Sequence, residues 1–105
     1  MDINNLVTES GYLKDFSDWN NDVANELASQ EEINLTNEHL AVIYLLQDFY
    51  NQYKHSPPIR VLLKLMKENL STASANSIYL QKLFPVSPIM QACKIAGLPK
   101  PNSCI

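Results

Sequence analysis

The amino-acid sequence predicts a mainly α-helical fold: a compact helical bundle with a small N-terminal extended or β-hairpin element and a flexible C-terminal arm. The chain has 105 residues, enough for one domain with its own core, and 46% of them are hydrophobic. It contains only two glycines, which disfavours a turn-rich β fold. Apolar residues recur at helical spacing along most of the chain. We therefore expect residues 1–105 to form a single domain, with residues 97–105 as its mobile arm.

The N-terminal part is predicted to hold a short extended element followed by a helix. Ser10-Gly11 indicates a turn, so residues 1–13 are expected to form an extended piece or a small hairpin. Residues 17–30 are predicted to be helical, with Ser17 as the N-terminal cap. The apolar face of this helix repeats in steps of four, at Trp19, Val23 and Leu27.

Two further helices are predicted in the middle of the chain. Thr36 can cap a helix over residues 37–53, which is apolar around most of its circumference and is therefore expected to be the central buried helix. Pro57-Pro58 then breaks the chain, and a helix over residues 59–70 begins directly after the prolines. One face of this second helix is basic and carries Arg60, Lys64 and Lys67.

The last third of the sequence predicts two short helices and the arm. A helix over residues 75–84 is stopped by Pro85. Ser87-Pro88 is a strong helix start, and Gly97 is the expected stop of the helix that follows. The remaining residues are rich in proline and are expected to be extended.

Charge is distributed unevenly along the chain. Residues 1–53 carry ten acidic residues and one basic residue, whereas residues 54–105 carry seven basic residues and one acidic residue. The basic half holds both cysteines, so an anion or an acidic partner would be attracted towards them. The alternative is that the two halves simply attract each other in the folded protein.

Several classes of protein are disfavoured by the sequence. No apolar run approaches the about 18 residues of a membrane span, and the polar N-terminus is not a signal peptide. A reducing, cytoplasmic setting is therefore expected. Cys93 and Cys104 have ten residues between them, and only His39 and His55 could add ligands, which is not a zinc pattern. We expect no metal site and no cofactor.

Cys104 is the second-to-last residue and lies on an arm with little sequence around it to bury it. Its pKa is expected to be near the ordinary value of about 8.5, because the terminal carboxylate and Lys100 act in opposite directions. Such a thiol is suited to being loaded in a partner's active site. The alternative is that a terminal cysteine has no function.

Cys93 is expected near the C-terminal end of its helix, where the helix dipole disfavours a thiolate. It could be a small core residue. It could also meet Cys104, because the arm can fold back; a disulfide would require Cα atoms within about 7 Å.

Five segments in order resemble the DsrC/TusE/DsvC family of sulfur-relay proteins, and together they cover almost the whole chain. The most specific is the A-G-L-P-K-P core ahead of a penultimate cysteine. The segments are GYLKDFSDW (residues 11–19), LTNEH (35–39), DFYNQYKHSPPIRVLLK (48–64), the N-S-x-Y-L-x-x-L-F-P pattern (76–85) and QACKIAGLPKPNSCI (91–105).

The resemblance implies a helical fold with a mobile arm and a sulfurtransferase that acts as a carrier, without independent turnover. It implies that Cys104 receives sulfur as a persulfide inside a partner. One branch of the family accepts sulfur from an upstream donor complex and passes it to the enzyme that thiolates the tRNA wobble uridine. The other works with dissimilatory sulfite reductase and uses both cysteines, which bridge through an extra sulfur as a trisulfide. Cys93 matches that second cysteine.

Two other functions remain open at this point. The helices over 59–70 and 75–84 are joined as in a helix-turn-helix, but the low isoelectric point, about 5.2, makes direct nucleic-acid binding a weak prediction. A thiol-redox regulator would instead use a Cys93–Cys104 disulfide. If the protein is a sulfur carrier, we predict that Arg60, Lys64 and Lys100 attract an anionic sulfur species or an acidic partner. The alternative is that these residues only form a solvated helix surface.

Overall fold

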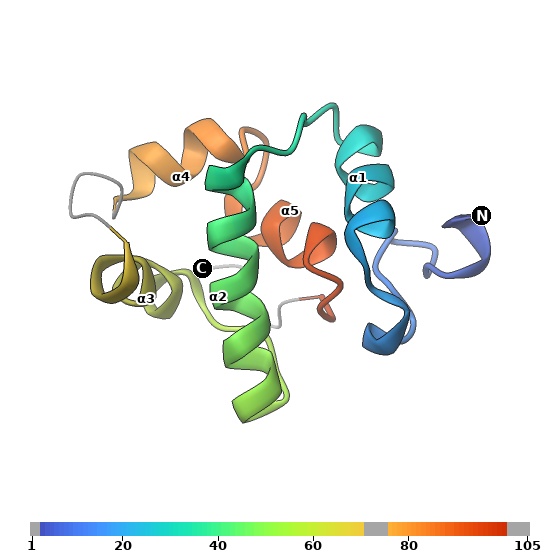
Figure 1. Ribbon diagram of the computed structural model, residues 1–105, viewed down its shortest axis with the longest axis horizontal. Helices are drawn as coiled ribbons and strands as arrows, with labels where there is room; N and C mark the ends of the chain where they lie inside the picture. Colours follow the sequence, from blue (N-terminus) through green and yellow to red (C-terminus); the bar gives the residue numbers. More distant parts are fainter. Residues whose placement is uncertain (1–2, 71–75, 101–105) are drawn as a thin grey trace.

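Five α-helices make up most of the computed structural model, which describes residues 3–70 and 76–100 (Figure 1). The Cα radius of gyration is 12.7 Å, as expected for a compact chain of this length. The prediction of a mainly α-helical bundle is therefore confirmed. The helices are α1 (Asn21–Gln30), α2 (Asn37–Tyr53), α3 (Ile59–Asn69), α4 (Ser77–Leu83) and α5 (Pro88–Ile95), and two short 3-10 turns cover Ile3–Asn5 and Phe16–Asp18.

The helix at the centre of the fold is α5. It packs against α1, α2 and α4, and Figure 1 shows it in the middle of the molecule with α1 on one side and α2 on the other. We expected the helix over residues 37–53 in this place. α2 does bury one face, but Tyr44 and Tyr53 on its other side are 47% and 52% exposed. Tyrosine can lie at the surface because its hydroxyl stays in water. The prediction counted these tyrosines as apolar and therefore expected α2 to be more deeply buried than it is.

The first helix begins later than predicted. Phe16–Asp18 form a separate 3-10 turn, and Trp19 is extended, so α1 starts only at Asn21. The cap is Asn20, whose side chain accepts a hydrogen bond of 2.9 Å from the backbone N–H of Val23. Asn20 has the capping geometry that Ser17 was expected to have, because the extended backbone at Trp19 ends the preceding turn.

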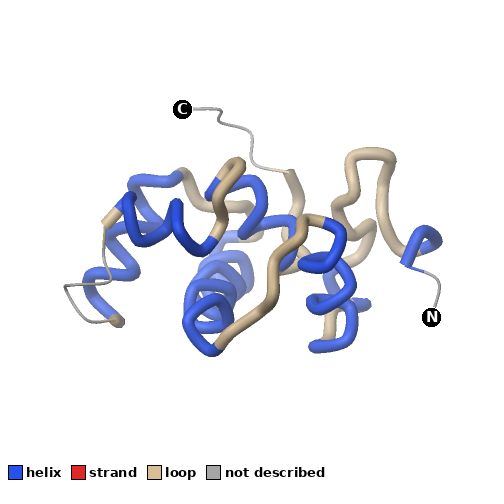
Figure 2. The backbone as a smooth tube through the Cα atoms, turned by 90° about the horizontal axis from the view of Figure 1, so that it is seen from above, coloured by secondary structure: helices blue, strands red, loops and turns tan. Residues whose placement is uncertain are grey.

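The N-terminal element contains less β structure than predicted. In the described part of the chain, the pairing is one isolated antiparallel bridge, between Val7 and Leu13, and Figure 2 draws helices and loops without a strand. The turn between them uses Gly11 at φ +87°, a conformation that glycine adopts without strain. The hairpin prediction is therefore correct about the turn, but no strand forms around it.

The start of α2 is tied to the end of α4 by His39. The Thr36 hydroxyl caps α2, as predicted, and the backbone N–H of Thr36 donates to His39 Nδ1 at 3.1 Å. With Nδ1 accepting, Nε2 carries the proton and donates to the backbone carbonyl of Leu83 at 2.8 Å. The histidine ring is 8% exposed and packs edge-on against Phe84. His39 therefore joins α2 to α4 through a residue that lies 44 positions further along the chain.

The starts of α4 and α5 differ in how they are capped. Asn76 caps α4, and its side chain accepts from the backbone N–H of Tyr79 at 2.8 Å. Ser87 is the residue before α5, as predicted, but its hydroxyl makes no capping bond. The side chain of Gln91 takes that role and accepts from the backbone N–H groups of Val86 and Ser87.

Candidate functional site

The thiol that the structure describes is Cys93, on the last turn of α5. Cys104 lies outside the described residues. The Cys93 side chain is fully buried and is not in a disulfide. Burial raises the pKa of the Cys93 thiol from its ordinary value of 9.0 to about 12, although a hydrogen bond with Ser56 acts in the opposite direction. In this arrangement Cys93 is a neutral thiol at physiological pH and cannot act as the first nucleophile.

The backbone turns sharply directly after α5 and passes over Cys93. Gly97 has φ +81°, as expected of a helix-ending glycine, and its N–H donates to the carbonyl of Lys94 at 3.1 Å. The N–H of Leu98 donates to the carbonyl of Cys93 itself at 3.0 Å. Gly97 and Leu98 are both buried. The first two residues of the predicted arm are therefore part of the core.

Three side chains from distant parts of the sequence hold this turn. Trp19 Nε1 donates to the carbonyl of Ile95 at 2.8 Å, and Gln47 Nε2 donates to the carbonyl of Ala96 at 2.9 Å. The Ser56 hydroxyl donates to the carbonyl of Pro99 at 2.8 Å. Carbonyls at the end of a helix have no partner within the helix, so these donors satisfy groups that would otherwise need water. The arm is thereby anchored as far as Pro99. We call the segment Cys93–Pro99 the arm root.

Sequence reasoning missed all three of these anchoring residues. Trp19 was assigned only to an apolar face, while Gln47 and Ser56 were not assigned a role. One signal was available, because a glutamine within an otherwise apolar stretch of α2 must find a hydrogen-bond partner if it is buried. Gln47 is 8% exposed and does so. The partner carbonyl could not be identified from the sequence.

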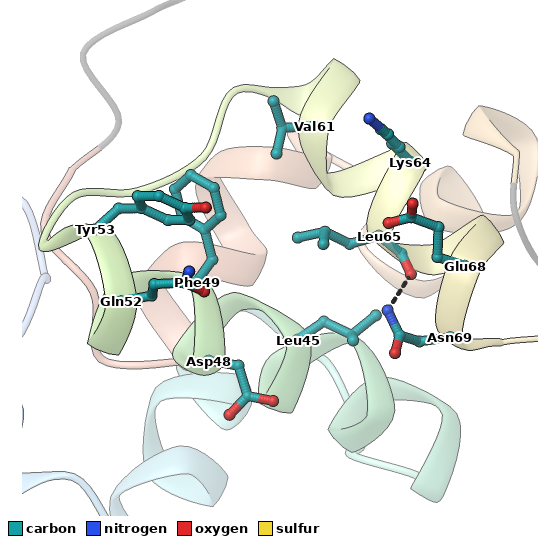
Figure 3. Close-up of a pocket in the computed structure, with 10 residues that line it drawn as sticks. All are labelled: Leu45, Asp48, Phe49, Gln52, Tyr53, Val61, Lys64, Leu65, Glu68 and Asn69. Atoms are coloured by element: carbon teal, nitrogen blue, oxygen red, sulfur yellow. Dashed lines mark hydrogen bonds between the residues drawn. The ribbon is translucent and has the colours of Figure 1, made fainter.

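The predicted basic residues are exposed, but the structure does not bring them into one site. Lys64 lines an open groove of about 430 Å³ between α2 and α3 (Figure 3). Lys100 lines a second hollow of about 300 Å³ beside Tyr12, Glu31 and Lys94. Arg60 lines neither of these two hollows and lies on the exposed face of α3. The ten residues around the groove are Leu45, Asp48, Phe49, Gln52, Tyr53, Val61, Lys64, Leu65, Glu68 and Asn69.

The acidic and basic halves of the chain are joined by little direct ion pairing. Within residues 3–70 and 76–100 the one salt bridge is that of Lys94 with Glu31, at 3.2 Å. The same lysine ammonium lies 5.5 Å from the centre of the Tyr12 ring. The cations of α3 have no ion-pair partner in that part of the chain, so direct ion pairs with the acidic half do not account for them. They remain available to an anionic ligand or an acidic partner surface.

Metal binding and membrane insertion find no support in the described residues. None of them form a group of three or more histidine, cysteine, aspartate or glutamate side chains that could hold a metal ion. No helix in the described ranges is long and apolar enough to cross a membrane.

Comparisons with known proteins agree with the geometry of the fold. Residues 2–105 match the family described as DsrC like protein. The sulfurtransferase TusE homolog of Haemophilus influenzae is 47% identical over 108 aligned residues, which cover 100% of this chain and 99% of that protein. The NMR structure of Allochromatium vinosum DsrC is similar with a TM-score of 0.86 and 43% identity, covering 94% of this chain and 88% of that one. The oxidized gamma-subunit of the dissimilatory sulfite reductase (DsrC) from Archaeoglobus fulgidus is similar with a TM-score of 0.81 and 38% identity, covering 94% and 90%.

Proposed function

The chain belongs to the DsrC-like protein family and is a sulfurtransferase of the sulfur-relay kind, and on this premise we propose that it carries sulfur as a persulfide on Cys104. The observation that supports this assignment is the state of the other cysteine. Cys93 is fully buried, with a pKa of about 12. Since the sequence has two cysteines, the terminal one is left as the thiol that meets a donor.

The proposed transfer needs no chemistry beyond thiol exchange. The Cys104 thiolate attacks the outer sulfur of a persulfide on the donor protein. A new S–S bond forms at Cys104, the S–S bond of the donor breaks, and the donor cysteine leaves as a thiolate. Repeating the exchange in the opposite direction delivers the sulfur to the next protein. The carrier is neither oxidised nor reduced over the complete cycle.

The anchored arm root limits how far the sulfur can travel. Because Ser56 holds Pro99, the reach of the Cys104 thiol is counted from Pro99. Five residues from Pro99 to Cys104 span at most about 18 Å. A partner therefore has to bring its reactive sulfur within that distance of the loop between α2 and α3. The exposed cations Arg60, Lys64 and Lys100 lie on α3 and at the start of the arm, where we propose that they attract an acidic partner.

The partners are proteins, and their identity is a further part of the proposal. We propose an upstream donor that carries a persulfide, in the cytoplasm. Downstream, we propose either an enzyme that thiolates the tRNA wobble uridine or dissimilatory sulfite reductase. The first follows the TusE-like relatives, and the second follows the DsrC-like structures and the presence of Cys93.

Intact-mass measurement tests the carrier role. The reduced protein and its Cys93→Ala and Cys104→Ala variants are exposed to a donor protein loaded with persulfide. We expect a gain of one sulfur atom, about 32 Da, in the wild type and in Cys93→Ala. Cys104→Ala should show no gain. Absence of any gain in all three proteins would contradict the carrier proposal and favour the thiol-redox regulator.

The same measurement separates the two downstream branches. A wild-type species with one extra sulfur and no alkylatable thiol would mean that both cysteines act together, as in the DsrC-like branch. A species that keeps Cys93 as an alkylatable thiol would favour the TusE-like branch.

The helix-turn-helix alternative gains nothing from the structure, because the exposed face of α4 offers a single cation among Ser77, Ile78, Gln81 and Lys82.

A further inference from the structure

Ser56 contacts both the arm root and the second thiol. It lies in the loop between α2 and α3 and is only partly exposed. Its hydroxyl donates to the carbonyl of Pro99 at 2.8 Å, and its side chain is also hydrogen-bonded with Cys93. The interaction with Ser56 lowers the pKa of the Cys93 thiol, but burial raises that pKa by more, to about 12. The thiol therefore stays protonated as long as it is buried.

The buried hydrophobic residues that follow Cys93 in the arm root belong to the same core as Cys93 itself. The N–H of Leu98 is bonded to the carbonyl of Cys93, and the Leu98 side chain is fully buried. Trp19 and Gln47 hold the end of α5 itself, whereas Ser56 holds the last anchored residue, Pro99. The hydrogen bond from Ser56 to Pro99 lies at the surface, whereas the bond from Trp19 is partly buried and that from Gln47 is buried. Opening of the arm root would therefore begin at Ser56, because a partly solvated hydrogen bond is exchanged for water at the smallest cost.

We propose that Ser56 is a positioning residue that latches residues 97–99 against the core beside Cys93, so that the second cysteine becomes reactive only when the Ser56–Pro99 hydrogen bond opens. Release has two consequences for the thiol. Residues 97–99 can move away from the core that buries it, and the Ser56 hydrogen becomes available to stabilise the thiolate. The latch thereby keeps Cys93 inactive while Cys104 is loaded.

This inference rests on the proposed function in one respect, which is that Cys104 carries the persulfide. The step under control would be attack of the Cys93 thiolate on the sulfur of Cys104. A Cys93–Cys104 bond forms, the bond from Cys104 to the outer sulfur breaks, and the outer sulfur leaves as hydrosulfide. The proton of the Cys93 thiol goes to solvent. No external oxidant is required, because the persulfide is the oxidant.

Alkylation of Cys93 measures the latch directly. In a Cys104→Ser background Cys93 is the only thiol, and its rate of reaction with iodoacetamide at pH 8 reports how often the arm root opens. We expect Ser56→Ala to raise this rate roughly fivefold, the effect of losing one hydrogen bond of ordinary strength. Ser56→Thr keeps the hydroxyl and should return the rate to within roughly twofold of the parent.

Ser87→Ala is the matched control. Ser87 stands at the start of α5, the helix that carries Cys93, and its hydroxyl makes no capping bond. It should leave the alkylation rate unchanged. The latch proposal fails if Ser56→Ala reacts no faster than Ser87→Ala. It also fails if Ser56→Thr is accelerated as much as Ser56→Ala, because the hydroxyl would then not be the cause.

Hydrogen exchange gives a second test that keeps Ser56 in place and does not depend on the folding of a variant at that position. The opening constant from exchange of the Leu98 amide should agree with that from Cys93 alkylation. Both should exceed the constant for global unfolding measured in urea. If both opening constants instead equal the constant for global unfolding, the latch proposal is overturned. Loading of Cys104 in the Cys93→Ala variant is independent of these results, so failure of the latch and failure of the carrier role can be distinguished.

Discussion

The two helices that carry the predicted functional residues, α3 and α5, are built in opposite ways. α3 buries two side chains, Leu62 and Met66, and packs mainly against α2. α5 is shorter, yet it buries half of its residues and contacts three other helices. The basic candidates on α3 are exposed, whereas the thiol on α5 is fully buried.

The basic residues of α3 and the thiol of α5 therefore differ in what they need before they can act. A cation on α3 can attract a partner because it is solvated and unpaired within the described ranges. A thiol on α5 is restrained by the fold itself and needs a change in structure before it reacts. Substitutions at the end of α5 should therefore affect stability strongly, and substitutions on the outer face of α3 should affect association alone.

The largest expected effect is that of Gly97→Ala at the end of α5. A Cβ atom at this position would lie 2.7 Å from Trp19 Cδ1 and 2.9 Å from Leu13 Cδ1, at a backbone φ of +81°. The indole cannot move away easily, because its Nε1 is bonded to Ile95. We expect the free energy of unfolding to fall by about 3 kcal/mol and the melting temperature by roughly 12–24 °C. Urea denaturation measures the change in the free energy of unfolding, and a thermal melt measures the change in melting temperature.

Gly11→Ala is the control for that substitution. Gly11 has a similar φ of +87°, but its nearest neighbour is the far end of the long Lys94 side chain, whose ammonium lies at 3.3 Å and can shift more easily than a packed indole. Only the backbone conformation should then contribute, and we expect a loss of about 1 kcal/mol. Equal losses for the two variants would mean that the packing around the arm root is not tight.

A smaller effect follows from the burial of Cys93 as the pH rises. The folded state holds the thiol proton up to a pKa of about 12, whereas an ordinary thiol loses it above 9.0. Between these values the unfolded chain binds fewer protons than the folded chain, so the free energy of unfolding decreases with pH. We expect a loss of about 1 kcal/mol between pH 8 and pH 10, measured by urea denaturation at fixed ionic strength.

Cys93→Ala should remove the contribution of Cys93 to this dependence and leave the smaller contribution of Tyr12, because burial also raises the pKa of Tyr12 to about 12. The pH slope of the variant is therefore the relevant quantity, rather than its absolute stability. A slope that is the same in both proteins would show that the Cys93 thiol is not shielded in solution.

The smallest effect on stability is expected from Arg60→Gln with Lys64→Gln on α3. Both side chains are exposed, so the free energy of unfolding should change by less than about 0.5 kcal/mol. The rate of sulfur transfer from a donor protein should fall, and its dependence on salt should weaken. Lys14→Gln removes an exposed cation outside α3 and should leave the rate unchanged. An equal loss in that control would assign the effect to net charge alone.

The sequence by itself determined the helices and their order, because the signals are local. The Thr36 cap, the Pro57-Pro58 break and the stop at Gly97 each act within one or two turns of the backbone. They are found where expected. The first helix shows the limit of this reasoning, since Ser17 was predicted as its cap, whereas the structure uses Asn20.

Only the tertiary structure decided which helix is central and how the second thiol is held. The small side chains of Ala92, Cys93 and Ala96 are all fully buried, and they allow α5 to approach its neighbours closely. The donors from Trp19, Gln47 and Ser56 reach carbonyls 76, 49 and 43 residues further along the chain. No local pattern encodes such pairings, because a buried carbonyl accepts from any donor that the fold brings within reach.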